Sequence, residues 1–588
     1  MGIISPAFSN AQEKVAGKQK NISSVPFPHL PFNNDTGKIQ FAIISDLWGG
    51  NRPGVFEDAV SKIELLQPQF VMSVGDLING ATYDTLLIDK QRDAFEQSIR
   101  PLTMPFFYVP GNHDIGNPVM EKQWIKRLGN PYYSFVYKNA LFLVINTEDG
   151  GHGGIGDQQI EYFKTAIYDN PKVRWTFLFM HRPVWQGLNG KEEGYEKIEA
   201  LLQDRNYTLF SGHHHTYVNL VKNGRKHFVL GSTGGGSDLR GEKYGEFDHI
   251  TMVTLGKEEP KIVNLALNGI VKEDVVNEKT FPLTQTLIDE NWMHIRPVVS
   301  EQQWEKTITA QIEFENTNAV PLVVSGNLCA KNGYHISPCN IDITIAPKQK
   351  ISQQIVIANK NNMRIDLAKL SSIDLTLNGS YMYNNTSYLI PATKKLLLSW
   401  KLPVPDKKNI YKPVSKTFHG IDTSAMIPLN NPEYLDRKWY WSGTKDAFVR
   451  FKLEKEGGYI HIVALVTDDQ WVLSDKGQKD VFYLDLENAD GGHNRIVVSP
   501  DSDQFNIEGK GTLRNEDVVL KRYFTDSILL MDYRISVDKL RKKDHSVRIN
   551  IGYRDQDNQP DKQYAVFFWK PVWETIGDYK NSGSFLIK

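Results

Sequence analysis

The chain has 588 residues, enough for about three or four domains of ordinary size. Hydrophobic residues make up 40% and charged residues 23%, as in soluble globular proteins. A formal net charge of -1 gives no global basic field for nucleic acid, and no apolar run reaches the roughly 18 residues of a membrane-spanning helix.

Residues 1–36 are predicted to be a leader. It starts with a short apolar stretch, and Ser9-Asn10-Ala11 would suit signal cleavage, but a basic first region and a full hydrophobic region are missing. The leader is therefore either the remnant of a signal peptide or a disordered extension.

Residues 37–272 alternate strand and helix signals. Helical patterns such as VFEDAVSKIELLQ and DQQIEYFKTAIYD lie between short apolar runs of strand length: IQFAIIS, QFVMSV, PFFYV, LFLVIN, VRWTFLFM and YTLFS. This alternation predicts an α/β domain with central β-sheets flanked by helices.

Two all-β sandwich domains are predicted after it. Residues 280–400 alternate apolar and polar positions between Asn, Gly and Pro, as in an immunoglobulin-like β-sandwich. Residues 401–416 are rich in Pro and Lys and predict a linker. Residues 417–588 contain strand runs such as GYIHIVALVTDD and predict a second β-sandwich.

The two cysteines lie in the first of these β-domains. Cys329 and Cys339 are ten positions apart around KNGYHISP, a spacing that fits a hairpin closed by a disulfide. A disulfide would indicate an oxidising compartment, and hence a periplasmic or secreted protein. Two free buried thiols are the alternative.

In the first domain, five strands end in side chains that can bind metal. A single Asp or His at a strand end is usually a turn or capping residue. The chain has five such ends in order, and carboxylates with imidazoles suit Zn, Mn or Fe better than Ca. The residues are Asp46, Asp76, the triplet Asn112, His113 and Asp114, then His181, and finally His213, His214 and His215.

This order resembles the signature of the calcineurin-like metallophosphoesterases: D-x-H, G-D-x-x, G-N-H-[DE], a lone His, and G-H-x-H. The resemblance covers about residues 36–270, and four of the five blocks match. It implies two divalent metal ions of Mn, Fe or Zn, which clamp the attacking and leaving oxygens of a phosphate ester and activate a water.

The resemblance also implies a role for each matched residue. Asp76 would bridge the two metals, Asp46 and His215 would hold the first metal, and the other ligands would hold the second. His113 would be the acid beside the scissile oxygen, oriented by Asp114. The metal ligands would be Asp46, Asp76, Asn112, His181, His213 and His215.

The first block departs from the signature. FAIISDLWGG has Trp48 at the histidine position, and an indole has no lone pair to give a metal. Three alternatives remain for the first metal. Asp46, Asp76 and His215 would hold it alone, or Asn79 would assist, at the position where purple acid phosphatases have a Tyr. In the third alternative the first site is often empty. The first reading, with help from Asn79, is favoured, because the surrounding motifs resemble a bacterial subgroup that usually lacks this histidine.

Three further features concern the substrate. Trp48 is a candidate wall of the substrate pocket. Arg182, directly after His181, would either bind phosphate or form a salt bridge. The run STGGGSDLRG, Ser232 to Gly241, fits a tight loop better than an anion-binding nest of backbone N–H groups.

The last domain resembles family-nine-type carbohydrate-binding modules in HIVALVTDDQWVL, KDVFYLDLENAD and VFFWKPVW. This resemblance implies a carbohydrate partner. Trp439, Trp441 and Trp471 are candidates for stacking on sugar, although each is better explained singly as a core residue.

Together these features predict a metal-dependent phosphoesterase of the bacterial periplasm or exterior. Its substrate would be a phosphomonoester or phosphodiester on a glycan or lipid, with no nucleic acid as partner. The alternative is a non-catalytic glycan-binding protein with a degenerate phosphoesterase scaffold. The joint presence of His113, Asp114 and all the second-metal ligands favours the enzyme.

Overall fold

The computed structural model describes residues 37–149, 154–186, 193–267, 269–331, 333–407, 423–429, 435–436, 443–473, 479–502, 504–525, 527–556, 565–570 and 583–587. The chain divides into two compact units between Pro282 and Leu283. The predicted leader and positions 408–416 of the predicted linker lie outside the described residues. The domain boundaries given above remain predictions.

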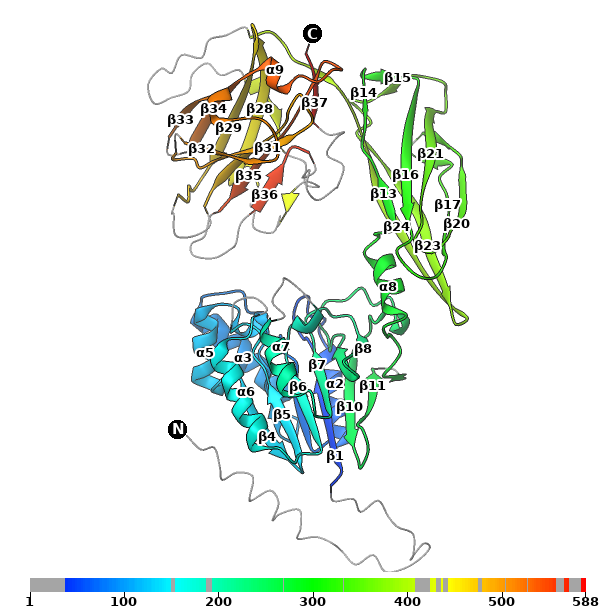
Figure 1. Cartoon of the computed structure of the whole chain (residues 1–588), viewed down its shortest axis with the longest axis vertical. Coiled ribbons are helices and arrows are strands. Elements are labelled where there is room, and N and C mark those ends of the chain that lie inside the picture. The colour runs from blue at the N-terminus through cyan, green and yellow to red at the C-terminus, as the bar shows by residue number, and fades with distance from the viewer. Residues whose placement is uncertain are drawn as a thin grey trace, which may run out of the picture. The chain divides into compact units, whose positions relative to one another are not determined.

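Two six-stranded sheets form the centre of the first unit (Figure 1). The first has the order β12-β11-β10-β1-β2-β3, in which β1 runs parallel to β2 and antiparallel to β10. Its strands are β1 (Ile39–Ile44), β2 (Phe70–Ser73), β3 (Phe106–Phe107), β10 (His249–Leu255), β11 (Lys261–Ala266) and β12 (Gly269–Lys272).

The second sheet has the order β4-β5-β6-β7-β9-β8. Strands β5, β6 and β7 are parallel neighbours, so their carboxyl ends lie at one edge. Its strands are β4 (Tyr133–Tyr137), β5 (Ala140–Val144), β6 (Trp175–Phe179), β7 (Tyr207–Ser211), β8 (Val218–Lys222) and β9 (Arg225–Val229).

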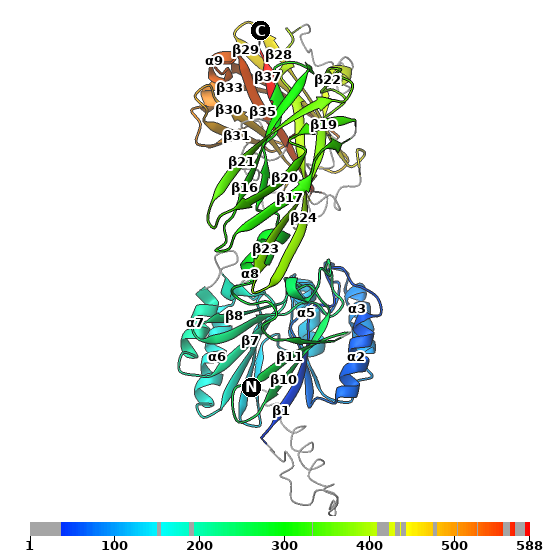
Figure 2. The same ribbon diagram turned by 90° about the vertical axis from the view of Figure 1, so that its right-hand side faces the viewer.

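The sheets pack face to face, and helices cover their outer faces. Phe41 of the first sheet lies 5.6 Å, centroid to centroid, from Phe142 of the second, within a fully buried layer of aromatic residues. Helices α2 (Val55–Leu66) and α3 (Thr85–Ile99) pack on the first sheet. Helices α6 (Asp157–Asp169) and α7 (Glu193–Leu201) lie on the opposite side (Figure 2).

Local sequence explains where several helices begin. Asp84 caps α3 by accepting from the backbone N–H of Leu86 and Leu87. Asn117 caps α5 (Pro118–Leu128), whose first residue is a proline that needs no N–H partner there. The remaining helical segments of this unit are α4 (Asn112–Ile115), η1 (Val184–Gln186) and η3 (Glu242–Tyr244).

The helix α8 (Phe281–Ile288) crosses the boundary between the two units, because its first two residues belong to the first unit. The sequence did not predict this helix. Pro282 at its second position is compatible with a helix start. A sandwich of two five-stranded sheets follows. One sheet has the order β13-β16-β21-β19-β18, and the other β14-β24-β23-β17-β20, with the pair β15-β22 beside them.

The longest strands of this sandwich pair antiparallel, β16 with β21 and β23 with β24, and buried and exposed residues alternate along them. The strands are β13 (Met293–Ile295), β14 (Val298–Ser300), β15 (Trp304–Glu305), β16 (Thr307–Glu315), β17 (Leu322–Asn327), β18 (Ala330–Lys331), β19 (Tyr334–Ser337), β20 (Asn340–Ile345), β21 (Lys350–Asn359), β22 (Ile365–Asp366), β23 (Ser372–Tyr383) and β24 (Thr386–Trp400).

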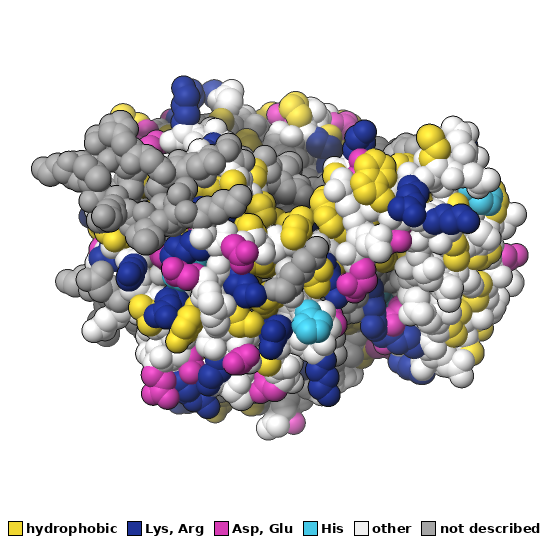
Figure 3. Space-filling model, turned by 90° about the horizontal axis from the view of Figure 1, so that it is seen from above, with side chains coloured by type: hydrophobic (Ala, Val, Ile, Leu, Met, Phe, Trp, Pro, Cys, Tyr) yellow, Lys and Arg dark blue, Asp and Glu magenta, His cyan; other side chains and the backbone are white. Residues whose placement is uncertain are grey.

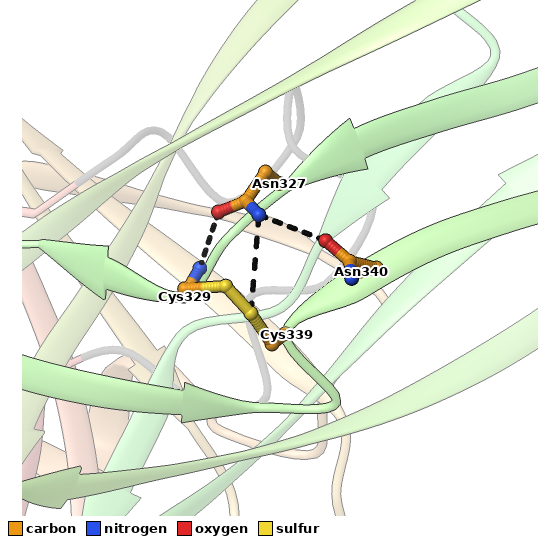
Figure 4. Close-up of a disulfide and its surroundings, with 4 residues drawn as sticks. All are labelled: Asn327, Cys329, Cys339 and Asn340. Atoms are coloured by element: carbon orange, nitrogen blue, oxygen red, sulfur yellow. Dashed lines mark hydrogen bonds between the residues drawn. A yellow bond between two sulfur atoms is a disulfide. The ribbon is translucent and has the colours of Figure 1, made fainter.

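A disulfide joins Cys329 to Cys339 in this sandwich (Figure 4). Asn327 accepts from the backbone N–H of Cys329 at 3.0 Å and donates to the Asn340 side chain at 2.8 Å. Of the two alternatives left open by the sequence, the structure has the disulfide.

A second sandwich, around one large hydrophobic core, completes the chain. One sheet follows β25-β37-β35-β30-β31-β32, with β36 and β27 attached, and the other β26-β28-β29-β34-β33. The elements are β25 (Leu402–Pro403), η4 (Thr423–Ala425), β26 (Ile427–Pro428), β27 (Leu435–Asp436), β28 (Ala447–Glu456), β29 (Tyr459–Asp468), β30 (Val481–Glu487), β31 (His493–Val498), β32 (Phe505–Gly509), η7 (Asn515–Asp517), β33 (Val518–Phe524), β34 (Ile528–Ser536), α9 (Val537–Leu540), β35 (Ser546–Asp555), β36 (Ala565–Phe568) and β37 (Ser584–Leu586).

The predicted fold class is confirmed: an α/β domain with flanking helices precedes two all-β sandwiches. On the face shown in Figure 3, basic and acidic side chains are interspersed. Within the described ranges, every helix is too short or too polar to traverse a lipid bilayer.

Candidate metal centre

Loops at the carboxyl ends of four strands meet at one edge of the first unit. The backbone N–H groups of Leu47 and Trp48, after β1, donate to the Asp76 carbonyl after β2, at 3.1 and 3.2 Å. The N–H of Gly212, after β7, donates to the His181 carbonyl after β6, at 2.9 Å. These bonds align the loops that carry the predicted ligands.

Four predicted ligands of the second metal converge on one point. The Nε2 atom of His181 lies 3.0 Å from Asn112 Oδ1, 3.1 Å from His213 Nδ1 and 3.1 Å from Asp76 Oδ2. Two nitrogens and two oxygens with lone pairs so close together form a chelating set for a divalent transition metal.

Backbone contacts select which histidine nitrogen faces the centre. His181 donates from Nδ1 to the Val74 carbonyl at 2.9 Å, which leaves the Nε2 lone pair for a metal. His215 donates from Nδ1 to the Gly236 carbonyl at 2.5 Å, which again leaves Nε2. Carbonyl partners of this kind fix the tautomer and ring orientation of metal-binding histidines.

The predicted first-metal residues form a smaller group. His215 Nε2 lies 3.3 Å from Asp46 Oδ1, and Asp46 is fully buried. Asp46 also accepts from the Ser45 hydroxyl at 2.5 Å and from the His213 backbone N–H at 3.0 Å. The carboxylate is therefore fixed in place. Fewer predicted metal ligands lie close to Asp46 than lie close to His181.

Strained backbone supports this arrangement. Asp76, His213 and His215 have φ angles of 56°, 75° and 53°, in the left-handed region that costs non-glycine residues energy. A Cβ at Gly111 would lie 2.2 Å from Asp76 Oδ1, and one at Gly212 would lie 2.3 Å from Asp46 Oδ2. These two motif positions require glycine because a carboxylate occupies the space.

The protonation equilibria also fit a cation. Burial alone lowers the pKa of His181, but the carboxylates of Asp76 and Asp46 outweigh it and raise that pKa to about 9. Burial, together with the charge on His181, lowers the pKa of His213 to about 2. Burial raises the pKa of Asp46, but the hydrogen bond from His215 and the charge of His181 hold it well below its usual range. A dication would replace the proton on His181 as the charge that balances the two carboxylates.

His113 lies beside this cluster. Its Nδ1 donates to the Asn79 backbone carbonyl at 2.5 Å, and its Nε2 lies 4.0 Å from Asp76 Oδ2. Nε2 therefore faces the centre, as a proton donor should. Asn79 itself is exposed and contributes its backbone carbonyl here, so its predicted role as an assisting metal ligand stays a prediction.

The predicted orienting role of Asp114 is corrected. Its buried carboxylate accepts from the backbone N–H of Gly111 at 2.9 Å and of Leu77 at 3.2 Å, and the Asn79 carbonyl holds His113 instead. Burial raises the pKa of Asp114 to about 6 against the opposing charge of Arg92. Asp114 joins the loop after β2 to the helix α4.

Arg182 contacts both a carboxylate and a predicted ligand. Its Nε donates to Glu148 Oε1 at 2.5 Å, and its Nη1 lies 2.8 Å from His213 Nε2. The salt-bridge alternative is therefore present, while the phosphate contact stays a prediction. Glu148 was missed, although LFLVIN predicts a strand whose carboxyl end reaches the same edge.

Trp48, the departure from the signature, is half-buried. Its ring packs on the cluster formed by β1, β2, α2 and α3. It lines a hollow of about 360 Å³ with residues of α2 and α3, including Phe56, Leu87 and Phe95. Its predicted part in substrate binding stays a prediction.

The loop from Ser232 supports the first-metal residues. The backbone N–H groups of Thr233 and Gly235 donate to the Asp46 carbonyl at 3.1 and 3.0 Å, and that of Gly236 donates to the Gly49 carbonyl at 3.1 Å. Because these N–H groups already have partners, they do not form an anion nest. The tight-loop interpretation is the correct one.

Comparison with known proteins agrees with this geometry. Residues 39–217 match the model of the calcineurin-like phosphoesterase family. The N-terminal domain is a calcineurin-like phosphoesterase domain. The family match confirms the resemblance carried by the strand-end motifs, and the clustered Asp and His side chains support a dinuclear metal site.

Two curated relatives match this phosphoesterase domain. The 3',5'-cyclic adenosine monophosphate phosphodiesterase CpdA of Haemophilus influenzae is 23% identical over 197 residues, 31% of this chain and 67% of that protein. The serine/threonine-protein phosphatase CPPED1 of Mus musculus is 28% identical over 206 residues, 30% of this chain and 64% of that protein. The chain thus spans about two thirds of the length of these relatives.

Two solved structures each resemble a part of the chain. A dimetal phosphatase from Danio rerio has a TM-score of 0.32 and 13% identity, covering 40% of this chain and 98% of its own. A family 9 carbohydrate-binding module from Caldicellulosiruptor kristjanssonii, in complex with cellotriose, has a TM-score of 0.25 and 13% identity, covering 32% of this chain and 93% of its own.

Of the three candidate sugar-stacking tryptophans, only Trp471 lies among the described residues. Trp471 is partly buried against the core of the last sandwich, 5.1 Å from the Phe524 ring. The core explanation therefore suits Trp471. Trp439 and Trp441 lie outside the described residues.

Proposed function

We propose that this protein hydrolyses a phosphate monoester or diester at a centre of two divalent metal ions, Mn, Fe or Zn. The observation that carries the proposal is the convergence of Asp76, Asn112, His181 and His213 on one point, with His113 beside it. Asp46 and His215 would hold the other metal, bridged by Asp76.

The chemistry divides between metal and protein. Two bound cations supply an activated water and charge stabilisation for in-line displacement. The protein fixes its ligands by backbone contacts and presents the His113 Nε2 to the leaving-group oxygen. The Nδ1–H bond to the Asn79 carbonyl keeps the ring in that orientation when Nε2 gives up its proton.

The substrate is the finer part of the proposal. The cyclic phosphodiesterase and the phosphoprotein phosphatase among the relatives support ester hydrolysis of either class. The sequence resemblance of residues 417–588 to carbohydrate-binding modules supports a phosphate ester on a glycan, with a lipid as the competing carrier. The Cys329–Cys339 disulfide supports a periplasmic or secreted location.

The test is hydrolysis of chromogenic mono- and diesters with and without Mn. Turnover should require the metal and should collapse in Asp76→Ala and His213→Ala. His214→Ala is the matched control, because His214 is exposed and falls at the variable position of G-H-x-H. Wild-type turnover in either ligand variant, folded by circular dichroism, would mean that the site is wrongly assigned. Failure to hydrolyse any ester with any metal would favour the non-catalytic alternative.

A further inference from the structure

Two loops pack against the ring of His215: residues 48–52, after β1, and residues 232–237, after β9. A Cβ at Gly49 in the first loop would lie 2.9 Å from His215 Cε1. A Cβ at Gly235 in the second loop would lie 3.2 Å from the same atom. The backbone of both loops is therefore in close contact with the ring, and the position of the ring depends on how the two loops are held.

An ion pair between Arg52 and Asp248 joins these two loops at the residue before β10. Arg52 donates from Nη2 to Asp248 Oδ1. The same oxygen accepts from the Gly234 backbone N–H at 3.0 Å and from the Ser232 hydroxyl at 3.1 Å. The backbone N–H of Arg52 donates to the Gly234 carbonyl at 2.8 Å. One carboxylate therefore anchors both the first loop and the second.

The Arg52–Asp248 pair is mostly shielded from water. The Asp248 side chain is 11% exposed and that of Arg52 is 25% exposed. Charge-assisted hydrogen bonds in such surroundings are stronger than those of fully exposed pairs. Loss of either partner would leave the other charge partly buried without its counterion, which destabilises the arrangement of the loops.

The second loop also carries the group that orients His215. The Gly236 carbonyl, two residues beyond Gly234, accepts from His215 Nδ1 at 2.5 Å. The other ring nitrogen, Nε2, lies 3.3 Å from Asp46 Oδ1. Because Trp48 stands at the histidine position of the signature, His215 is the one imidazole among the predicted ligands of the first metal. A shift of the loop would move this imidazole away from Asp46.

The second-metal group has supports of its own. His181 is oriented by the Val74 carbonyl, which accepts from its Nδ1 at 2.9 Å, and Asn112 lies at the start of α4. Neither Val74 nor Asn112 belongs to the two loops that the ion pair joins. A disturbance of the Arg52–Asp248 pair should therefore act on one metal and spare the other.

We propose that Arg52 and Asp248 are positioning residues for the first metal, because their ion pair holds the loop whose Gly236 carbonyl orients His215. The inference rests on the proposed dinuclear centre and adds the residues that set the affinity of its more weakly held metal.

The test is a double-mutant cycle on metal affinity, with Arg52→Ala, Asp248→Ala and the double variant in competition with a chromogenic chelator for Mn. Each single variant should weaken the more weakly held Mn by about 10-fold, the lower end of the range for an outer partner of a metal-binding histidine. The affinity of the other Mn should change by less than about twofold. Because the two residues act as one pair, the double variant should be no weaker than the worse single variant by more than about twofold.

Turnover of a chromogenic phosphate ester separates positioning from contact with the substrate. Turnover that the variants lose at low Mn should return to the wild-type value at Mn concentrations that saturate them, with KM for the ester unchanged. Turnover that does not return, or a raised KM at saturating Mn, would mean that Arg52 or Asp248 contacts the substrate, and would overturn the positioning role.

Arg127→Ala is the matched control. Arg127 on α5 donates from Nε to Glu96 on α3 at 2.7 Å, and its side chain is 27% exposed, close to the value for Arg52. It should leave both Mn affinities unchanged. If an alanine variant does not fold, Arg52→Lys or Asp248→Asn takes its place, because the first loses the planar fork and the second loses the charge.

The outcomes for this inference and for the proposed function are separable. Unchanged Mn affinities in the folded variants would overturn the inference and leave the proposed function standing. Wild-type protein that binds two Mn but hydrolyses no ester would overturn the proposed function alone, since the affinity measurement does not need turnover. Wild-type protein that binds no Mn would overturn both.

Discussion

Gly236→Ala should loosen the more weakly held metal while leaving the other in place. A Cβ at this position would lie 2.1 Å from the Gly49 carbonyl oxygen, a backbone atom that cannot rotate away as a side chain can. The loop must shift, and with it the Gly236 carbonyl that accepts from His215 Nδ1 at 2.5 Å.

The expected magnitude follows from the loss of this support. Removing an outer partner of a metal-binding histidine typically costs about 10- to 100-fold in metal affinity, or roughly 1.4–2.8 kcal/mol. His181, by contrast, is oriented by the Val74 carbonyl, so the second-metal group should keep its affinity.

The assay is elemental analysis of the protein across a chelator titration. Gly256→Ala is the control, because nothing lies within 4 Å of a Cβ there. In Gly236→Ala one equivalent of metal should leave at a lower chelator concentration than in the wild type or the control. If both equivalents leave at wild-type concentrations from folded Gly236→Ala protein, the loop does not support His215 as described.

Four further outcomes are expected. His113→Ala should lower turnover by about 10²–10⁴-fold with metal content unchanged, and loss of metal would move His113 into the ligand set. Trp48→His should raise the affinity of the site for the more weakly held metal, and Trp48→Ala should leave metal binding unchanged. If the two sites of the wild type bind metal with equal affinity, and Trp48→His raises neither affinity, another residue already serves as ligand. Because the pKa of His181 is raised to about 9, its proton is bound below that pH and lost above it, so metal binding below pH 9 should release a proton and strengthen as pH rises; binding independent of pH would contradict this. Denatured, unreduced protein made in an oxidising compartment should contain no titratable thiol from Cys329 or Cys339, and two thiols would exclude the disulfide.

Much of the catalytic domain could be predicted because its strands are continuous apolar runs. YTLFS and DQQIEYFKTAIYD coincide with β7 and α6, since a buried parallel strand and an amphipathic helix have strong periodic patterns. The short β3 and the strands β8, β9, β11 and β12 give weaker signals, because each is partly exposed or only a few residues long. Helix α8 was missed for the same reason.

The strand-end motifs, and the family signature that they resemble, predicted which side chains lie together, but not the groups that support them. Which carbonyl holds a histidine depends on loops that are distant in sequence: Gly236 for His215 and Val74 for His181. The family resemblance implied that Asp114 orients His113, whereas the Asp114 carboxylate accepts from the backbone N–H groups of Gly111 and Leu77. Glu148 has no motif, and only the pairing of β5 with β6 brings it to Arg182.

The most direct test of the dinuclear centre is an anomalous difference map from a crystal of the protein grown with Mn, recorded at wavelengths on both sides of the Mn absorption edge. Two peaks are expected, one among Asp76, Asn112, His181 and His213 and a weaker one between Asp46 and His215. A map with no peak among these six residues, from protein that binds Mn in solution, would contradict the assignment of the metal centre.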